Sequence, residues 1–222
     1  MDRMSLEFIG RVAVLKFNHP EVMNAVGGKM LEDFVEAIAQ IKARGSETRC
    51  LPLSRGLGDV YKRQAVNGAA AGVGMSFAMM GDIVCASRQA YFLQAFARIG
   101  LIPDGGATFL LPRLVGWGRA MELSLLAERL PAEQAQEWGL VNRVYDDQEA
   151  LMSGAMEVAN RLANGPKSLS LIRKAYWKTW SNSYEQQLEL ESDLQNEAGQ
   201  SSDFKEGVSA FLQKRDAQFQ GQ

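Results

Sequence analysis

Two glycine-rich turns, each followed by an apolar segment with helical spacing, constrain the fold of this chain most. Residues 67–74 read NGAAAGVG and residues 100–106 read GLIPDGG. Glycine lets a backbone approach a ligand closely, and a helix start offers unpaired N–H groups at the positive end of the helix dipole. Two such helix starts in one small fold predict a site that holds a negatively charged oxygen. The carboxylate of Asp104 lies in the second turn.

Strand-like and helix-like segments are mixed over the first two thirds of the chain, and the rest is helical. Short apolar runs with period two predict strands at 6–9, 12–17, 83–86, 91–93 and 141–145. Apolar residues at helical spacing predict helices at 29–42, 105–115, 119–127, 132–138, 148–163, 167–180, 184–198 and 203–213. Ser202 or Asp203 is expected to cap the last helix. This order predicts an α/β fold with a core over residues 1–160 and a C-terminal helical region over residues 161–222.

Residues 50–64 (CLPLSRGLGDVYKRQ) match neither period. They stand where an α/β core should have another strand and helix. One interpretation is a long surface loop. We prefer the interpretation that they are foreign sequence that replaces native residues, because residues 59–64 resemble translated sequencing-adapter read-through. The fold is therefore expected to lack one internal strand and helix segment.

Composition excludes several classes of function. The formal charge of −2, with lysine and arginine scattered along the chain, gives no sign of nucleic-acid binding. Two cysteines, Cys50 and Cys85, are too few for a disulfide framework or a cysteine-based metal site. The single histidine, His19, excludes a zinc-binding H-E-x-x-H motif and is expected in a surface turn.

Nothing in the chain predicts a membrane location. The N-terminal residues lack the pattern of a signal peptide, and no run of about 18 apolar residues predicts a membrane span. The cytoplasm is therefore the expected location.

Six motifs, in order along the chain, resemble the crotonase superfamily, the enoyl-CoA hydratase/isomerase family. They lie at residues 17–25, 65–72, 78–83, 100–106, 132–141 and 206–215, and the resemblance covers about residues 5–44 and 65–222. It implies a spiral of ββα units, a homotrimer or a dimer of trimers, and an acyl-CoA thioester as the substrate. Coenzyme A is then the carrier of the substrate, with no further cofactor and no metal.

The resemblance also implies an oxyanion hole of two backbone N–H groups, which binds the thioester carbonyl and stabilises an enolate. The second donor is the N–H of Val73, next to Gly72. Tight packing of a helix on a sheet is the alternative explanation for this turn. The first donor belongs to a glycine-rich segment between Arg44 and Ala65, for which this sequence has no match.

Asp104 is the expected acid and base. Hydratases of the family use two glutamates, and their positions align with Ser76 and Phe96, which weakens a hydratase assignment. One carboxylate suffices to move a proton from one carbon of an enoyl thioester to another, which shifts the double bond. Phenylacetate-pathway isomerases, which act on ring-epoxide or unsaturated CoA esters, show a similar pattern around Phe96 and Asp104. In a ring epoxide the same steps could accompany expansion to an oxepin.

The environment of Asp104 is expected to support this role. Apolar neighbours, among them Ile99 and Ile102, are expected to bury its side chain partly and strengthen it as a base. The alternative role for Asp104 is a helix cap before residues 105–106. The resemblance also implies that Asn24, Ala25, Gly72, Phe96 and Gly105 bind the substrate.

The C-terminal helix carries two further expected ligand contacts. Phe211 and Lys214 resemble tail residues that reach the phosphate-adenosine end of coenzyme A. The alternative is a solvated helix face with one core phenylalanine. The aromatic residues at 176, 177, 180 and 184 are expected to pack between helices or at a trimer contact.

Three other functions stay open. The first is an enoyl-CoA hydratase. The second is an aryl-CoA dehalogenase, in which Asp104 would attack the ring as a nucleophile; those enzymes carry a tryptophan where this chain has Phe96. The third is an inactive CoA-binding relative, because the first oxyanion donor has no match.

Overall fold

A computed structural model describes residues 2–17, 28–44, 50–51 and 61–222. The expectations for His19, Asn24 and Ala25 lie outside these residues, as do those for most of the segment 50–64.

The main sheet has six strands in the order β1-β2-β3-β4-β6-β9. The strands are β1 (Met4–Ile9), β2 (Val12–Phe17), β3 (Cys50–Leu51), β4 (Tyr61–Val66), β6 (Ile83–Ser87) and β9 (Arg143–Tyr145). The first two form an antiparallel hairpin, and Gly10, at φ +56°, supplies the left-handed turn between them. Every other pair in this sheet is parallel.

A second sheet of three strands, in the order β5-β7-β8, carries the first glycine-rich turn. Its members are β5 (Ala69–Ala71), β7 (Tyr91–Leu93) and β8 (Leu130–Pro131). β5 pairs with β7 in parallel, so that Ala71 lies opposite Leu93 at the end of the pair. The chain leaves β5 at this point and enters a helix directly.

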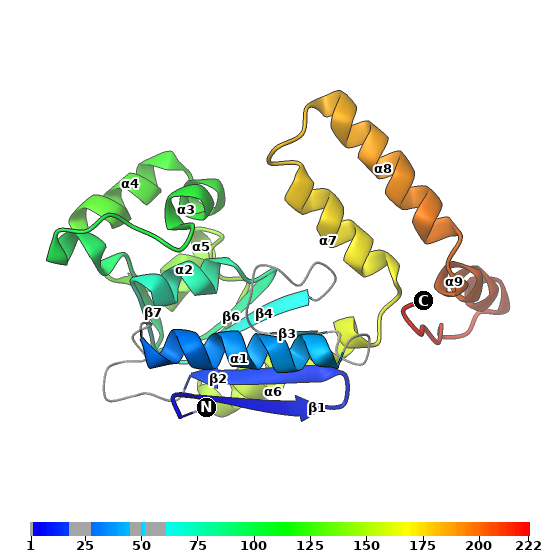
Figure 1. The fold of residues 1–222 in the computed structure, drawn as a ribbon, viewed down its shortest axis with the longest axis horizontal. Helices are drawn as coiled ribbons and strands as arrows, with labels where there is room; N and C mark the ends of the chain where they lie inside the picture. The colour runs from blue at the N-terminus through cyan, green and yellow to red at the C-terminus, as the bar shows by residue number, and fades with distance from the viewer. Residues whose placement is uncertain (1, 18–27, 45–49, 52–60) are drawn as a thin grey trace.

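Nine α-helices and one described 3-10 helix surround the sheets in the described part of the chain. They are α1 (Lys29–Ala43), α2 (Val73–Met79), η3 (Ala95–Ile99), α3 (Ala107–Val115), α4 (Trp117–Leu126), α5 (Ala132–Glu137), α6 (Gln148–Ala163), α7 (Ser168–Lys178), α8 (Tyr184–Gly199) and α9 (Ser202–Gln213). α6 packs along the main sheet and α1 against the hairpin, whereas α2 packs against β5 and α3 (Figure 1). Pro112 lies inside α3, and the helix continues to Val115.

The main core lies where α2, α3, α4 and α5 meet the ends of the strands. Its fully buried side chains include Met75 of α2, Phe92 of β7 and Leu110 of α3. Burial of such side chains contributes about 1.5–3 kcal/mol each. The helices that follow the two glycine-rich turns are therefore fixed by packing, which holds both turns in place. Cys85 is buried in β6.

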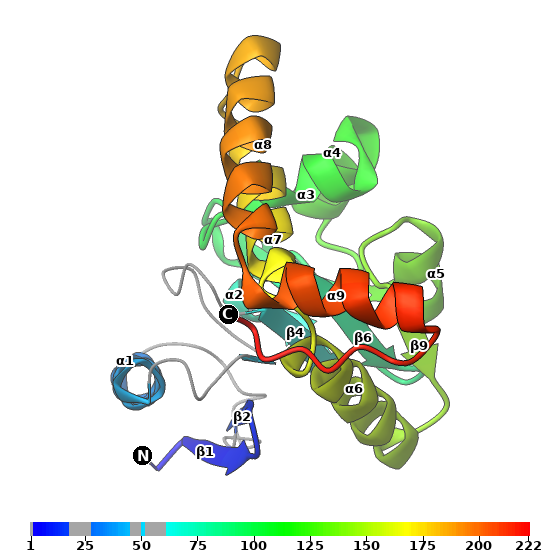
Figure 2. The same cartoon turned by 90° about the vertical axis from the view of Figure 1, so that its right-hand side faces the viewer.

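The last three helices form a layer beside this core. α7 and α8 form a hairpin that projects away from the sheets (Figure 1), and α9 lies at its base (Figure 2). Asp82, just before β6, accepts hydrogen bonds from Arg173 Nε (2.7 Å) and Trp177 Nε1 (3.2 Å) of α7. This contact ties α7 to the core. The α/β fold with a C-terminal helical layer is thus confirmed.

Besides the elements β5, β8 and η3, which the sequence does not predict, and small shifts of element ends, two details differ from the sequence predictions. Residues 50–51 and 61–64 lie in β3 and β4, although residues 50–64 show no strand period. β4 pairs in parallel with β6, with Arg63 opposite Ile83. This pairing uses main-chain hydrogen bonds, so it does not require a strand-like pattern of side chains. The second correction concerns α9, whose N-cap is Ser201 and neither Ser202 nor Asp203; the Ser201 hydroxyl accepts from the N–H of Phe204 at 3.0 Å.

Candidate active site

The first glycine-rich turn joins β5 to α2 through Gly72. Its φ of +54° and ψ of −124° belong to a region that only glycine adopts without strain. The N–H of Gly72 donates to the carbonyl of Leu93 at 2.8 Å, which anchors the turn to β7. Val73 is the first residue of α2, so its N–H has no acceptor within the helix. In the described part of the chain this N–H has no other acceptor and is free to bind a ligand oxygen.

The second glycine-rich turn joins η3 to α3. Gly100, Gly105 and Gly106 adopt positive φ values of 73°, 62° and 84°. Gly106 is the N-cap of α3, and no side chain caps this helix. The alternative role of Asp104 as a side-chain cap is therefore wrong. Asp104 takes part through its main chain, where its carbonyl accepts from the N–H of Ala107 at 3.1 Å.

Ser76 of α2 connects the two turns. Its hydroxyl donates to the carbonyl oxygen of Asp104 at 2.9 Å and lies 3.4 Å from the carbonyl oxygen of Gly72. A methyl group on Gly105 would lie 2.9 Å from the Cβ of Ser76, closer than side-chain carbons approach one another. The fold thus brings Gly72, Val73, Asp104 and Gly105 together, as the sequence predicts for one site.

Phe96 of η3 closes one side of the first turn. Its ring is buried, and a methyl group on Gly72 would lie 3.8 Å from the ring atom Cζ. Gly72 therefore lies close to both the Leu93 carbonyl and the Phe96 ring. An apolar ring at this place suits an apolar acyl or aryl group better than an ionised side chain would.

The prediction that the Asp104 side chain is partly buried is wrong for a single copy of the chain. Asp104 is exposed, and its apolar neighbours Ile99 and Ile102 are 72% and 81% exposed. The turn contacts α2 through Ser76 and Gly105, but within the described chain Asp104 itself stays exposed. The sequence correctly places apolar side chains beside Asp104, but it does not show what covers them.

The two C-terminal residues lie apart from the turns, on α9. Phe211 is 82% exposed, and Lys214 ends the helix in a left-handed conformation at φ +52°. Residues 214–222, which we call the C-terminal strap, then run back along α9 (Figure 2). The structure does not bring Phe211 or Lys214 to Asp104.

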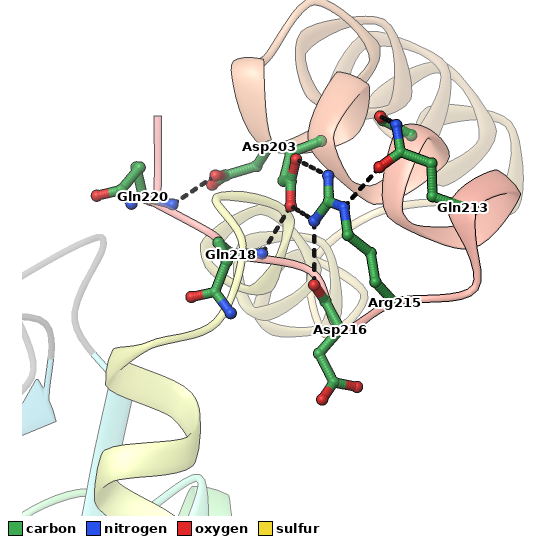
Figure 3. Close-up of polar contacts among 8 residues, drawn as sticks. Asp203, Gln213, Arg215, Asp216, Gln218 and Gln220 are labelled. Atoms are coloured by element: carbon green, nitrogen blue, oxygen red, sulfur yellow. Dashed lines mark hydrogen bonds and ion pairs between the residues drawn. The ribbon is translucent and has the colours of Figure 1, made fainter.

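Two carboxylates fix the strap to α9 (Figure 3). Buried Asp203 accepts from the N–H groups of Gln220 (2.7 Å), Gln222 (3.0 Å) and Lys167 (2.9 Å). Glu206 accepts from the Arg215 guanidinium and from the N–H of Gln218 (2.8 Å). Together these two partners lower the pKa of Glu206 from 4.5 to about 2. The strap and α9 thus form one unit, which Asp203 joins to the residue before α7.

Sequence reasoning missed the roles of Ser76 and Asp203. The sequence identifies Ser76 only as a position where the hydratases have a glutamate, and Asp203 only as a possible helix cap. A small polar residue one helical turn after Val73, facing a Gly-Gly pair, was the signal available for Ser76. Among the described residues, no group of three or more His, Cys, Asp or Glu side chains could hold a metal ion. No helix among them is long and apolar enough to cross a membrane.

Comparison with known proteins agrees with this geometry. The family model described as enoyl-CoA hydratase/isomerase matches residues 64–222. Among curated proteins, the 1,2-epoxyphenylacetyl-CoA isomerase of Escherichia coli K12 is 40% identical over 251 residues, covering 95% of each chain. A probable enoyl-CoA hydratase of Rhodobacter capsulatus is 38% identical over 247 residues, again covering 95% of each chain.

The fold also matches a solved structure. The crystal structure of an enoyl-CoA hydratase subunit I from Geobacillus kaustophilus HTA426 superposes with a TM-score of 0.91 at 29% identity. That superposition covers 99% of this chain and 98% of the other. The predicted crotonase-type fold is thereby confirmed. The 251 positions aligned with the E. coli isomerase exceed the 222 residues of this chain, so that relative has residues without a counterpart here.

Proposed function

Because this chain belongs to the enoyl-CoA hydratase/isomerase family of enzymes, we propose that it shifts a double bond in an enoyl- or aryl-CoA thioester. One observation carries this proposal: Asp104 lies beside the Val73 turn, whereas the two positions that align with the glutamates of the hydratases hold Ser76 and Phe96. Hydration needs a positioned base and a positioned acid. Isomerisation needs one carboxylate that takes a proton and returns it.

The proposed reaction has two proton transfers. The N–H of Val73 donates to the thioester oxygen, on which negative charge develops, as in other oxyanion holes. The Asp104 carboxylate takes a proton from one carbon of the acyl chain, and the electron pair enters a conjugated enolate. The protonated Asp104 then returns the proton two carbons along, so that the double bond moves and no group is added or lost.

A ring-epoxide CoA ester is the substrate class we favour. The name of the E. coli relative, 1,2-epoxyphenylacetyl-CoA isomerase, and the buried ring of Phe96 beside Gly72 support it. In this proposal Asn24, Ala25, Gly72 and Gly105 also contact the substrate. Phe211 and Lys214 bind the phosphate-adenosine end of coenzyme A.

We also propose that residues 50–64 replace native sequence that held the first oxyanion donor. The family match begins at residue 64, which is the last residue of this segment. The alignment with the E. coli isomerase spans 251 positions, more than the 222 residues of this chain, which supports a stretch of native sequence missing here. The division into a core over 1–160 and a helical region over 161–222 belongs to the same proposal.

A homotrimer or a dimer of trimers is the assembly we propose. Large apolar side chains beside the second turn and on α4 are exposed, among them Ile102 (81%), Trp117 (72%) and Leu125 (65%). An open groove of about 560 Å³ between α7 and α8 is lined by Leu171, Ile172 and Leu188. Burial of these surfaces by copies of the chain would cover Asp104 as the sequence predicts.

A parallel assay separates the candidate functions. The purified chain is incubated with a 3-enoyl-CoA, a 2-enoyl-CoA and 4-chlorobenzoyl-CoA, and products are identified by mass spectrometry and chromatography. A shifted double bond without change of mass supports the isomerase. A gain of one water indicates a hydratase, and release of chloride a dehalogenase. Retention on a CoA resin without turnover indicates an inactive relative, and each of these three results contradicts the proposal.

A further inference from the structure

Ser76 makes a side-chain hydrogen bond between the two turns of the site. The residue is fully buried on α2, one helical turn after Val73. Its hydroxyl donates to the carbonyl oxygen of Asp104 at 2.9 Å, across 28 residues of sequence. A serine hydroxyl in a helix commonly bonds the carbonyl four residues before it. Here that contact, to Gly72, is the longer one at 3.4 Å.

The second turn lies close against α2 at Gly105. A methyl group on Gly105 would lie 2.9 Å from the Cβ of Ser76 and 3.9 Å from Cγ1 of Val73. Gly105 therefore has no room for a side chain, and only a glycine lets the turn lie this close to α2. The contact limits the turn on one side, and the Ser76 hydrogen bond resists its movement away on the other.

The side chain of Asp104 depends on its main chain for position. It is exposed, and in the described part of the chain no group donates a hydrogen bond to its carboxylate. The turn around it contains three glycines at positive φ, a type of residue that readily changes conformation. Two donors fix the Asp104 carbonyl: the N–H of Ala107 and the Ser76 hydroxyl. Of these two donors, only the Ser76 hydroxyl belongs to α2, the helix that begins with Val73.

We propose that Ser76 is a positioning residue, which sets the place of the Asp104 carboxylate relative to the N–H of Val73. This inference rests on the proposed function, in which both groups act on one substrate. At this position the hydratases of the family have a catalytic glutamate. In this chain Ser76 stands there instead and holds the Asp104 turn in place. Misplacing a reacting group by about 1 Å costs on the order of 10²-fold in rate.

A double-mutant cycle tests the proposal. Ser76→Ala, Asp104→Asn and the double variant are compared with the unchanged chain in the isomerase assay. We expect Ser76→Ala to lower kcat by roughly 10- to 100-fold and to leave KM within about twofold. In the Asp104→Asn background the same substitution should change the residual rate by less than about twofold, because its effect acts through Asp104.

Ser87 supplies a matched control. It is also fully buried, and its hydroxyl donates to the carbonyl of Asn67 at the same distance of 2.9 Å. Ser87→Ala should lower the melting temperature about as much as Ser76→Ala does, while kcat stays unchanged. If Ser76→Ala does not fold, Ser76→Cys replaces it, because a thiol is a weaker donor of similar size. An intermediate kcat is then expected.

The outcomes are distinct. A normal kcat in Ser76→Ala or Ser76→Cys, or an equal loss in the Asp104→Asn background, overturns the positioning role and leaves the proposed function intact. Near-normal turnover of Asp104→Asn alone contradicts the proposed function itself, and the positioning role with it. Hydrogen exchange in residues 100–107 gives an independent measure: it should accelerate in Ser76→Ala and stay unchanged in Ser87→Ala.

Discussion

At the scale of single residues, the site depends on main-chain conformation more than on side-chain identity. Gly72 holds a φ and ψ combination that other residues reach only with strain. Val73 contributes its N–H, for which the side chain matters little. Substitution by alanine should therefore have a large effect at Gly72 and a small effect at Val73.

We predict that Gly72→Ala lowers both stability and turnover, whereas Val73→Ala changes turnover by no more than a few-fold. The strained conformation should cost about 1–3 kcal/mol, and the added methyl group itself would fit, in van der Waals contact with the Phe96 ring at 3.8 Å. Urea denaturation gives the free energy of unfolding, and the isomerase assay gives kcat. A Gly72→Ala variant with normal kcat would contradict the importance of this turn.

The sequence predicts part of this site. Glycines followed by apolar helices indicate both turns, since the required residue types stand next to one another in the chain. The contact between Ser76 and the Asp104 turn could not be predicted in the same way, because it depends on how α2 packs against a turn 28 residues away. The exposure of Asp104 was also unpredictable, because apolar neighbours do not reveal which surface covers them.

At the scale of secondary-structure elements, length decides what the sequence predicts. The hairpin of β1 and β2 and the helix α1 extend over enough residues for their periods to be recognised. The strands β3 and β5 have two and three residues, too few for any period. Main-chain pairing with longer neighbours holds them in the sheets.

The anchoring of α9 gives a prediction on stability. Asp203→Ala removes an acceptor from the N–H groups of Lys167, Gln220 and Gln222. The loss of these hydrogen bonds to a charged, buried acceptor should cost about 1–3 kcal/mol. Asp216→Ala is the control, since only the main-chain oxygen of Asp216 contacts Arg215 (Figure 3). Equal unfolding free energies of the two variants would contradict the role of Asp203.

The Glu206 contact predicts a pH dependence. The folded pKa of Glu206 is lowered from 4.5 to about 2 by Arg215 and the N–H of Gln218. A carboxylate with a lowered pKa stabilises the fold above its unfolded pKa, and this contribution is lost as the pH falls through the folded value. The melting temperature of Glu206→Gln should therefore lie below that of the unchanged chain at pH 6. This difference should shrink between pH 4.5 and about 2. A constant difference would contradict the assignment.

At the scale of the whole molecule, one chain does not complete the proposed site. Exposed Ile99 and Ile102 flank Asp104, and the groove between α7 and α8 is open. Light scattering should give the mass of three or six copies of the 24.5 kDa chain. Ile102→Glu should shift the population toward monomers and lower activity if a second copy covers this surface. A fully active monomer would contradict the proposed assembly.

The most direct test of the proposed function is the turnover of Asp104→Asn beside that of Asp216→Asn, with binding of the CoA ester measured by calorimetry. The proposal predicts that Asp104→Asn loses at least about 10²-fold in isomerisation, the usual contribution of a general base, while its affinity for the CoA ester is retained. Asp216→Asn should behave as the unchanged chain. Near-normal isomerisation by Asp104→Asn would contradict the claim that this carboxylate moves the proton.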